Sequence, residues 1–313
     1  MRRMPAADTQ HAALVSLQTI ASSLREKYAI REQPRKTEPR WRNVVGRKLN
    51  LSSALLSLSV LADSSLEHYR GSFQNRMMYL PLGVSAVTLA ASLFGIVDAR
   101  EKSHMVRDSL YGLAALTGAT GLGFHLYNVT KRPGGLSWVN LFYAAPVGAP
   151  IALLLAGMLG RGAERIRDDE GSTMLGYPAG EVLSMVASVG LAGTVAEAGL
   201  LHFRGAYHNP GMLLPVVVPP TAAGLLATSL FRSGKIVRRA ARLCLKLTAM
   251  LGFAGVGFHA YGVSRNMGGW RNWSQNILNG PPLPAPPSFT GLALAGLATL
   301  SLIERDRRAG FHG

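Results

Sequence analysis

The sequence predicts an all-α integral membrane protein of eight transmembrane helices, and three observations support this fold class. Only 16% of the 313 residues are charged, whereas 48% are hydrophobic. The hydrophobic residues occur in long blocks, each close to the roughly 20 residues that cross a bilayer as a helix. Two segments of the chain also recur 134 residues later, which divides the helices into two groups of four.

Windows of about 20 mostly apolar residues mark the individual spans. They cover residues 49–69, 79–98, 109–128, 140–160, 181–202, 213–231, 242–261 and 288–304. The first and fifth windows contain acidic residues, which weaken their hydropathy, and the internal repeat supports both. Pro215, Pro219 and Pro220 predict a break in the sixth helix, because proline removes a backbone donor and clashes with the preceding turn.

The repeat consists of two pairs of segments. Residues 63–71 (DSSLEHYRG) match 197–205 (EAGLLHFRG), and 118–135 match 252–269 at nine of eighteen positions. Each unit contains an even number of spans, so both units enter the membrane the same way up. They are therefore expected to form two parallel four-helix bundles, related by an axis along the membrane normal.

Basic residues predict the orientation. Of the 33 lysines and arginines, 26 lie before the first span, after the last, or in alternate loops between them. The positive-inside bias then places both termini in the cytoplasm, in the inner membrane of the cell. The predicted parts are a basic arm (1–48), a first membrane unit (49–160), a linker (161–180), a second unit (181–304) and a tail (305–313). An amphipathic helix over residues 9–27 would bind the arm to the surface of anionic lipid. The alternative is that the arm is a solvated tail.

Composition also excludes several classes of function. The net charge of +16 does not predict nucleic-acid binding, because the basic residues lie between apolar blocks without accompanying aromatic residues. The single cysteine, Cys244, excludes an intrachain disulfide, a cysteine-ligated iron–sulfur cluster and covalently attached haem. No His-x-x-Glu or His-x-x-x-His spacing predicts a metal centre on one helix face.

The predicted topology gathers polar residues at the outer ends of the odd-numbered helices. Asp63 and Glu197 are the candidate catalytic residues, because an acid about two turns inside a membrane helix needs a partner or a function. Arg70 and Arg204 are the expected partners. The candidate cofactor-binding residues are His68, Arg70, His125, Tyr127, His202, Arg204, His259 and Tyr261.

A purely structural interpretation competes with this site. His-Tyr-Arg-Gly and His-Phe-Arg-Gly are typical helix C-termini, with cations at the negative end of the dipole and glycine in a left-handed conformation. Asn75 and Asn209 would cap the helices that follow. This interpretation does not explain why a membrane-embedded acid recurs in both units.

Three chemical interpretations remain. In a quinone site, histidine would bind the ring oxygens and an acid would take the proton. Haem b would be ligated by His68 with His125, or by His202 with His259, and nearby glycines would admit the macrocycle unless they serve helix packing. A transporter with a site between parallel repeats is the third interpretation.

The favoured function is a multi-pass subunit of a respiratory-type oxidoreductase that handles quinone or electrons at its outer face. Its partners would be the lipid bilayer, an extracytoplasmic oxidoreductase subunit and quinone. The alternatives are a transporter or channel, and a structural membrane protein without chemistry. By architecture alone, two four-helix bundles with an outward polar site, the chain resembles membrane subunits of the polysulfide-reductase type, which implies a quinone site toward the outer face.

Overall fold

The computed structural model describes residues 41–308, apart from 101, 144–146, 169–172 and 232–233. The predicted amphipathic helix over 9–27 lies outside the described residues. The long helices are α2 (Trp41–Arg70), α3 (Leu80–Val97), α4 (Met105–Thr130), α6 (Gly148–Asp168), α7 (Ala179–Arg204), α8 (Leu214–Phe231), α9 (Lys235–Arg265) and α11 (Pro287–Arg308). The short elements are η1 (Arg76–Tyr79), α5 (Trp138–Tyr143), β1 (Thr173–Met174), β2 (Tyr177–Pro178), η2 (Pro210–Leu213), η3 (Gly269–Asn272) and α10 (Trp273–Asn279).

Six helical segments among the described residues are long and apolar enough to cross a membrane. They are α2, η1 with α3, α7, η2 with α8, α9 and α11. Helices α4 and α6 occupy the third and fourth predicted spans but do not reach the same hydropathy. Helix α6 carries five charged residues in its last eight positions, and α4 is rich in glycine and threonine. The chain is therefore a multi-pass all-α protein with six candidate spans in its described part.

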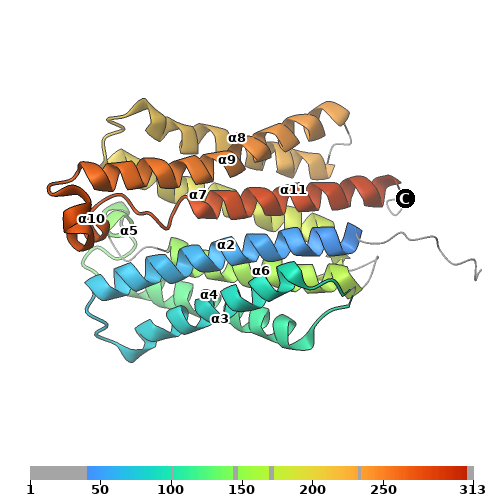
Figure 1. The fold of residues 1–313 in the computed structure, drawn as a ribbon, viewed down its shortest axis with the longest axis horizontal. Helices are drawn as coiled ribbons and strands as arrows, with labels where there is room; N and C mark the ends of the chain where they lie inside the picture. Colours follow the sequence, from blue (N-terminus) through green and yellow to red (C-terminus); the bar gives the residue numbers. More distant parts are fainter. Residues whose placement is uncertain (1–40, 101, 144–146, 169–172, 232–233, 309–313) are drawn as a thin grey trace, which may run out of the picture. The chain divides into compact units, whose positions relative to one another are not determined.

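Within residues 42–308 the helices pack around a central group formed by α2, α6, α7 and α11 (Figure 1). Helices α3 and α4 lie on one side of this group, and α8 and α9 lie on the other (Figure 1). The central α11 has 72% of its apolar window buried, whereas the outer α9 has only 17%. Outer helices with so little burial present their apolar side chains to lipid in a membrane protein.

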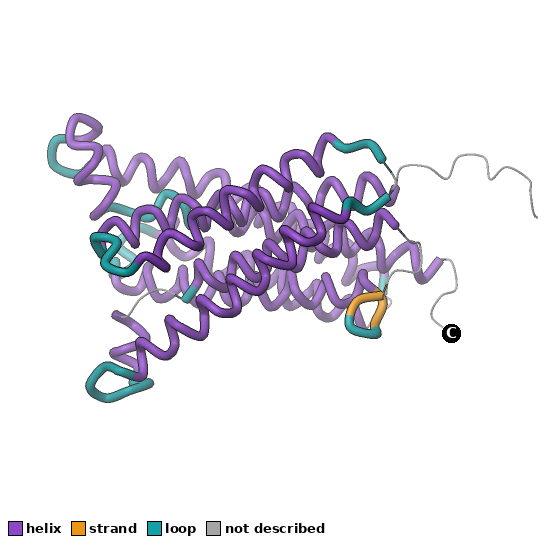
Figure 2. The backbone as a smooth tube through the Cα atoms, turned by 90° about the horizontal axis from the view of Figure 1, so that it is seen from below, coloured by secondary structure: helices purple, strands orange, loops and turns teal. Residues whose placement is uncertain are grey.

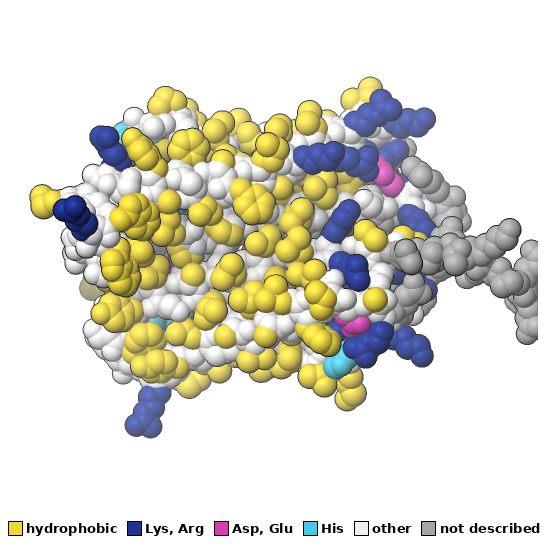
Figure 3. All heavy atoms as spheres, viewed as in Figure 1, with side chains coloured by type: hydrophobic (Ala, Val, Ile, Leu, Met, Phe, Trp, Pro, Cys, Tyr) yellow, Lys and Arg dark blue, Asp and Glu magenta, His cyan; other side chains and the backbone are white. Residues whose placement is uncertain are grey.

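The long helices run side by side, with most short connections at the two ends (Figure 2). Hydrophobic side chains cover the visible flank of the bundle, while lysine and arginine gather toward the end where α11 finishes (Figure 3). Such an apolar belt with a cationic end is the expected surface of a bilayer-spanning bundle.

Helix α8 is continuous from Leu214 to Phe231, so the break predicted at its prolines is absent. Pro215 is the second residue of the helix, where its missing N–H would have no intrahelical partner in any case. Pro219 and Pro220 follow within the second turn, and the helix continues past them. The bundle accommodates the lost backbone hydrogen bonds without a kink large enough to end the helix.

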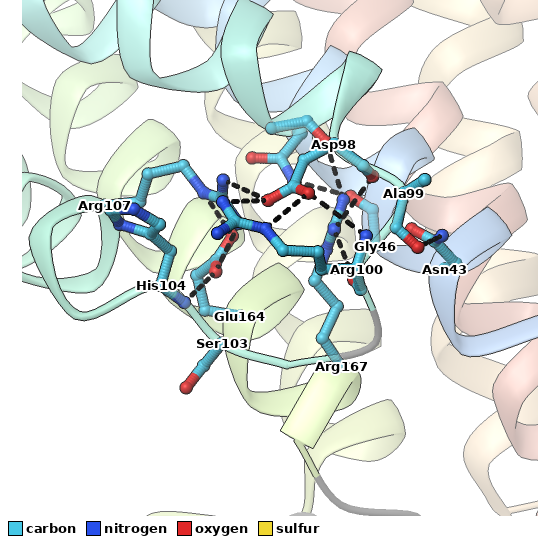
Figure 4. A network of polar contacts seen from close by, with 12 residues as sticks. Asn43, Gly46, Asp98, Ala99, Arg100, Ser103, His104, Arg107, Glu164 and Arg167 are labelled. Carbon is cyan, nitrogen blue, oxygen red and sulfur yellow. Dashed lines mark hydrogen bonds and ion pairs between the residues drawn. The ribbon is translucent and has the colours of Figure 1, made fainter.

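A network of buried ions joins the facing ends of α3, α4 and α6 (Figure 4). Arg107 donates to Asp98 at 2.7 Å and to both oxygens of Glu164 at 2.8 and 2.9 Å. The side chains of Arg107 and Glu164 are 3% and 0% exposed. At that burial each charge depends on the other, because an unpaired ion in the interior is strongly disfavoured.

The same network holds the connection between α3 and α4 against α6. Arg167 donates to the backbone carbonyls of Gly95, Asp98 and Arg100, which end α3 and lie just after it. Glu164 accepts the backbone N–H of His104, the N-cap residue of α4. One face of α6 therefore places a cation at a helix C-terminus and an anion at a helix N-terminus, both favourable to the helix dipoles.

Acid is expected to weaken this end of the bundle through Asp98, the first residue after the candidate span 76–97. Hydrogen bonds from Arg100 and then Arg107 hold the pKa of the Asp98 carboxyl well below its usual range. A carboxyl whose pKa is depressed by folding stabilises the protein above its unfolded pKa of about 4 and loses that contribution as the pH falls. The melting temperature of the detergent-solubilised protein should therefore fall from pH 5 toward pH 3.

The variant Asp98→Asn tests the assignment. It should melt below the parent protein at pH 7 and show a shallower decline over the same acid range, because residue 98 no longer titrates. Parallel melting curves for the two proteins would show that Asp98 is not the group responsible.

Candidate functional site

The two repeated helix ends adopt the same backbone conformation. After α2, Ser72 and Phe73 have φ of 55° and 46°, and after α7, Ala206 and Tyr207 have φ of 56° and 46°. The prediction of a left-handed backbone conformation at the glycine is wrong, since Gly205 has φ of −82°. A Cβ at Gly205 would lie 3.0 Å from Met212 Cε, and one at Gly71 3.1 Å from Met78 Cε, so a larger residue would require a small shift of a flexible methionine side chain.

Both predicted asparagine caps are confirmed. The Asn75 side chain accepts the N–H of Met77, and the Asn209 side chain accepts that of Gly211. Each starts a short 3-10 helix that leads into α3 or α8, so the chain reverses direction in the same way twice. This turn brings a backbone carbonyl from the start of the next helix back to the histidine before it.

Three of the four candidate histidines are held through the same ring nitrogen. The Nδ1 atoms of His68, His202 and His259 lie 2.6, 2.8 and 2.7 Å from the carbonyl oxygens of Met78, Met212 and Pro282. A carbonyl only accepts, so Nδ1 carries the proton in each ring and the neutral tautomer has an unprotonated Nε2. The same Nδ1-to-carbonyl contact orients imidazoles that bind metals through Nε2.

His202 and His259 come together between α7 and α9. Their ring centroids are 6.4 Å apart and their planes meet at 73°. Helices α8 and α11 each pack against both α7 and α9, so the two rings face each other across one four-helix bundle. Two imidazoles sharing a metal at about 2.0–2.1 Å per bond place their centroids roughly 6 Å apart, close to the distance observed.

The glycines near these histidines divide into two kinds. Added Cβ atoms at Gly118 and Gly252 would lie within 3 Å of the backbone of the facing helix segment, at Pro150 and Leu154 or at Pro286 and Thr290. These two glycines therefore serve close helix packing. A Cβ at Gly123 or Gly257 would meet nothing within 4 Å, so only these positions leave open space beside the helix.

The candidate acids approach each other at the centre of the helix group. Asp63 on α2 lies within electrostatic range of Glu197 on α7, as well as of Glu67 and Arg70. The Glu197 carboxylate rests on Gly148, the first residue of α6, where Oε2 lies 1.8 Å from the position that a Cβ would occupy. A carboxylate at a helix N-terminus interacts favourably with the dipole and the free N–H groups there.

Arg70 pairs with a different acid from the one that the sequence predicts. Arg70 forms its ion pair with Glu67, one turn earlier on α2. The guanidinium of Arg204 lies 5.2 Å from the ring centroid of Tyr143. Side chains three or four residues apart on a helix are neighbours, whereas positions 63 and 70 are separated by about two turns, so Glu67 is the nearer acid for Arg70.

The candidate tyrosines lie on the outward side of their helices. Tyr127 and Tyr261 are 55% and 62% exposed, and each ring lies beneath a cation one turn later, Lys131 or Arg265. Positions 259 and 261 are about 200° apart around the helix axis, so Tyr261 points away from His259. His125 is half-buried on α4. The structure therefore brings together one pair of histidines, His202 with His259, and one pair of acids, Asp63 with Glu197, and leaves the tyrosines outside both pairs.

Two contacts that position the acids were not predicted. Gly148 receives Glu197, and Ser59, one turn before Asp63, donates to Pro284 O and accepts from Ser288. Both join parts of the chain that are distant in sequence, and neither follows a recurrent spacing. A small residue at the start of α6 is the one signal that the sequence offers.

The arrangement provides one pair of imidazoles and one pair of acidic side chains, groups that can exchange protons with a bound molecule. Among the described residues, no group of three or more histidine, cysteine or acidic side chains is placed to hold a metal ion. Comparisons with protein-family models, with curated proteins and with solved structures found no match to this chain.

Proposed function

We propose that the protein is a membrane subunit of a respiratory-type oxidoreductase that takes electrons and protons from a quinol at the histidine end of the bundle. The observation that carries the proposal is the His202–His259 pair, in which both Nδ1 atoms are held by carbonyls. An imidazole held in this way offers Nε2 as an acceptor, which suits a quinol hydroxyl better than a quinone carbonyl.

In this proposal the two units form parallel bundles, all eight long helices cross the inner membrane, and both termini face the cytoplasm. The end of the bundle with few basic residues is then the outer face. Quinol oxidation releases two electrons and two protons. The protons pass to Nε2 of His202 or His259 and to the Glu197 and Asp63 carboxylates, and the electrons pass to a redox centre in an extracytoplasmic partner subunit.

Haem b is the alternative occupant of the same pair, because an Nε2 atom that ligates iron cannot also accept a proton from a quinol. His202 and His259 fit bis-imidazole ligation by their centroid distance, by their Nδ1 contacts and by their origin on two helices of one bundle. Bound there, haem would supply a one-electron carrier, and the acids alone would accept protons. The chain's own contribution would be to orient both imidazoles and to select the neutral tautomer in which Nε2 is the ligating atom.

A reduced-minus-oxidised visible spectrum of the purified protein tests the haem arm. A b-type spectrum that disappears in His202→Asn and His259→Asn would support haem ligation. Asparagine retains an amide donor near the Nδ1 position and lacks Nε2, so the carbonyl contact can persist. The control is His208→Asn, because His208 is exposed and makes only a contact within its own turn.

Quinol binding tests the second arm with the same variants. A quinol analogue should bind the parent protein at least about tenfold more tightly than His202→Asn, the loss of one buried hydrogen bond to the ligand. Glu197→Gln should retain binding and membrane insertion but abolish quinol oxidation by the complex. A flat spectrum together with no quinol binding would exclude the proposed function.

A further inference from the structure

A basic pocket lies at the opposite end of the bundle from the histidines. It encloses about 470 Å³ and is lined by Lys235, Arg238, Arg239, Arg242, Glu304 and Arg307. These residues come from the start of α9 and the end of α11, and dark-blue side chains gather over that end of the bundle in Figure 3. Five cations surround one carboxylate, so the pocket has a strong excess of positive charge.

The internal contacts of the pocket leave that excess in place. Glu304 is shared between Arg242 at 2.7 Å and Arg238 at 3.5 Å. Arg307 donates to the carbonyls of Ser229 and Leu230, at the end of α8. Within the described part of the chain, no carboxylate pairs with Lys235 or Arg239, which are both exposed.

These cations also lie at the N-terminus of α9, the helix end at which positive charge is unfavourable. Lys235, Arg238 and Arg239 occupy the first turns of α9, which has no acidic residue in its first turn and no side-chain cap from Gly234. The N-terminus of a helix carries partial positive charge, so cations there destabilise it unless an anion is present. A local arrangement that opposes helix stability is expected at a functional site.

The corresponding end of α4 shows what the α9 end lacks. Gly118 on α4 packs on Pro150 of α6 as Gly252 on α9 packs on Pro286 near α11, which aligns the two helix pairs. In this alignment Glu164, which accepts the His104 N–H at the start of α4, corresponds to Leu300. Asp108 in the first turn of α4 corresponds to Arg242. At the α4 terminus both positions are carboxylates, whereas at the α9 terminus they are a leucine and an arginine, and the nearby Glu304 carboxylate is already shared by Arg238 and Arg242.

We infer that this pocket binds the phosphate group of an anionic phospholipid. The phosphate supplies the anion that the start of α9 lacks, and the acyl chains continue along apolar side chains next to the pocket. Phe231 and Ile236 are 81% and 82% exposed, and α9 is the least buried of the candidate spans. Basic pockets between membrane helices at the cytoplasmic surface bind anionic headgroups in this way.

The experiment compares three probes on the full-length protein in a neutral detergent: phosphatidylglycerol, phosphatidylcholine and inorganic phosphate. Binding is read by native mass spectrometry and by the melting temperature. Phosphatidylglycerol should bind and raise the melting temperature, and Lys235→Gln with Arg239→Gln should weaken its binding by about tenfold or more. The matched control is Arg47→Gln with Lys48→Gln. It removes two exposed cations of α2 at the same end of the bundle and should leave binding unchanged.

Two outcomes would overturn the inference. Equal binding of phosphatidylcholine, or of phosphatidylglycerol to the Lys235→Gln/Arg239→Gln protein, would show that the pocket does not recognise the phosphate charge. An equal response to inorganic phosphate at the same concentration would show that the occupant is a soluble anion and not a lipid. Neither readout depends on quinol chemistry, so the inference stands or falls apart from the proposed function.

Discussion

Replacing Glu164 with alanine is expected to lower the free energy of unfolding by about 3–5 kcal/mol, the usual cost of removing one partner of a buried ion pair. Glu164 is fully buried and receives both guanidinium contacts of Arg107 and the N–H of His104. Without it, Arg107 keeps only Asp98 as an acidic partner, and the N–H of the N-cap residue His104 loses its acceptor. Reversible unfolding in mixed detergent micelles measures the loss.

The matched control is Arg161→Ala, which breaks a neighbouring pair on the same two helices. Arg161 and Asp108 are 42% and 31% exposed, so their pair should contribute no more than about 1 kcal/mol. The two variants remove ion pairs between α4 and α6 that differ mainly in burial. If both caused the same loss, the stability of this end would not come from the buried part of the network.

Replacing Gly157 with alanine is expected to cost about 1–3 kcal/mol, and more if the backbone has to move. Gly157 on α6 faces α4 so closely that an added Cβ would lie 2.4 Å from Tyr111 O and 2.5 Å from Ala115 N. Both atoms belong to the backbone and cannot rotate away, so the two helices must separate. The change should also loosen the packing that holds Tyr111, which is fully buried between them.

Gly123→Ala on α4 provides the comparison, because its Cβ would meet nothing within 4 Å. Alanine has the higher helix propensity, so this variant should be neutral or more stable by up to about 1 kcal/mol. The same unfolding measurement separates the two glycines. Equal stability of the Gly157 and Gly123 variants would contradict the close approach of α4 and α6.

Apolar blocks were sufficient to locate the helices, because each long helix overlaps one predicted window. They were not sufficient for membrane assignment, since α4 and α6 gain polarity from small residues and from charges that face the protein. Arg107, Glu164 and Arg167 lie outside the predicted spans, so the sequence placed them in cytoplasmic loops. Their network depends on partners 57 to 72 residues away, which spacing within one segment does not reveal.

The candidate site was partly predictable for a similar reason. The repeat identified the histidines and the asparagine caps, because each belongs to a local turn that recurs with its sequence. The partner of His68, His202 and His259 is a backbone carbonyl, which any residue can provide, so the sequence contains no sign of it. The proximity of Asp63 and Glu197 comes from two central helices 134 residues apart, which spacing within one helix does not reveal.

The central place of α11 has a consequence for how the protein is made. This helix follows the other long helices in the chain, yet it has the largest buried share, and Pro284 just before it bonds to Ser59 on α2. During synthesis the earlier helices enter the membrane while the groove that α11 fills is still open. Ser59 and the other side chains that line this groove must therefore contact lipid or a chaperone until almost all of the chain has been synthesised. Truncated chains that stop before residue 287 would leave this groove exposed. Such chains are expected substrates of quality-control proteases.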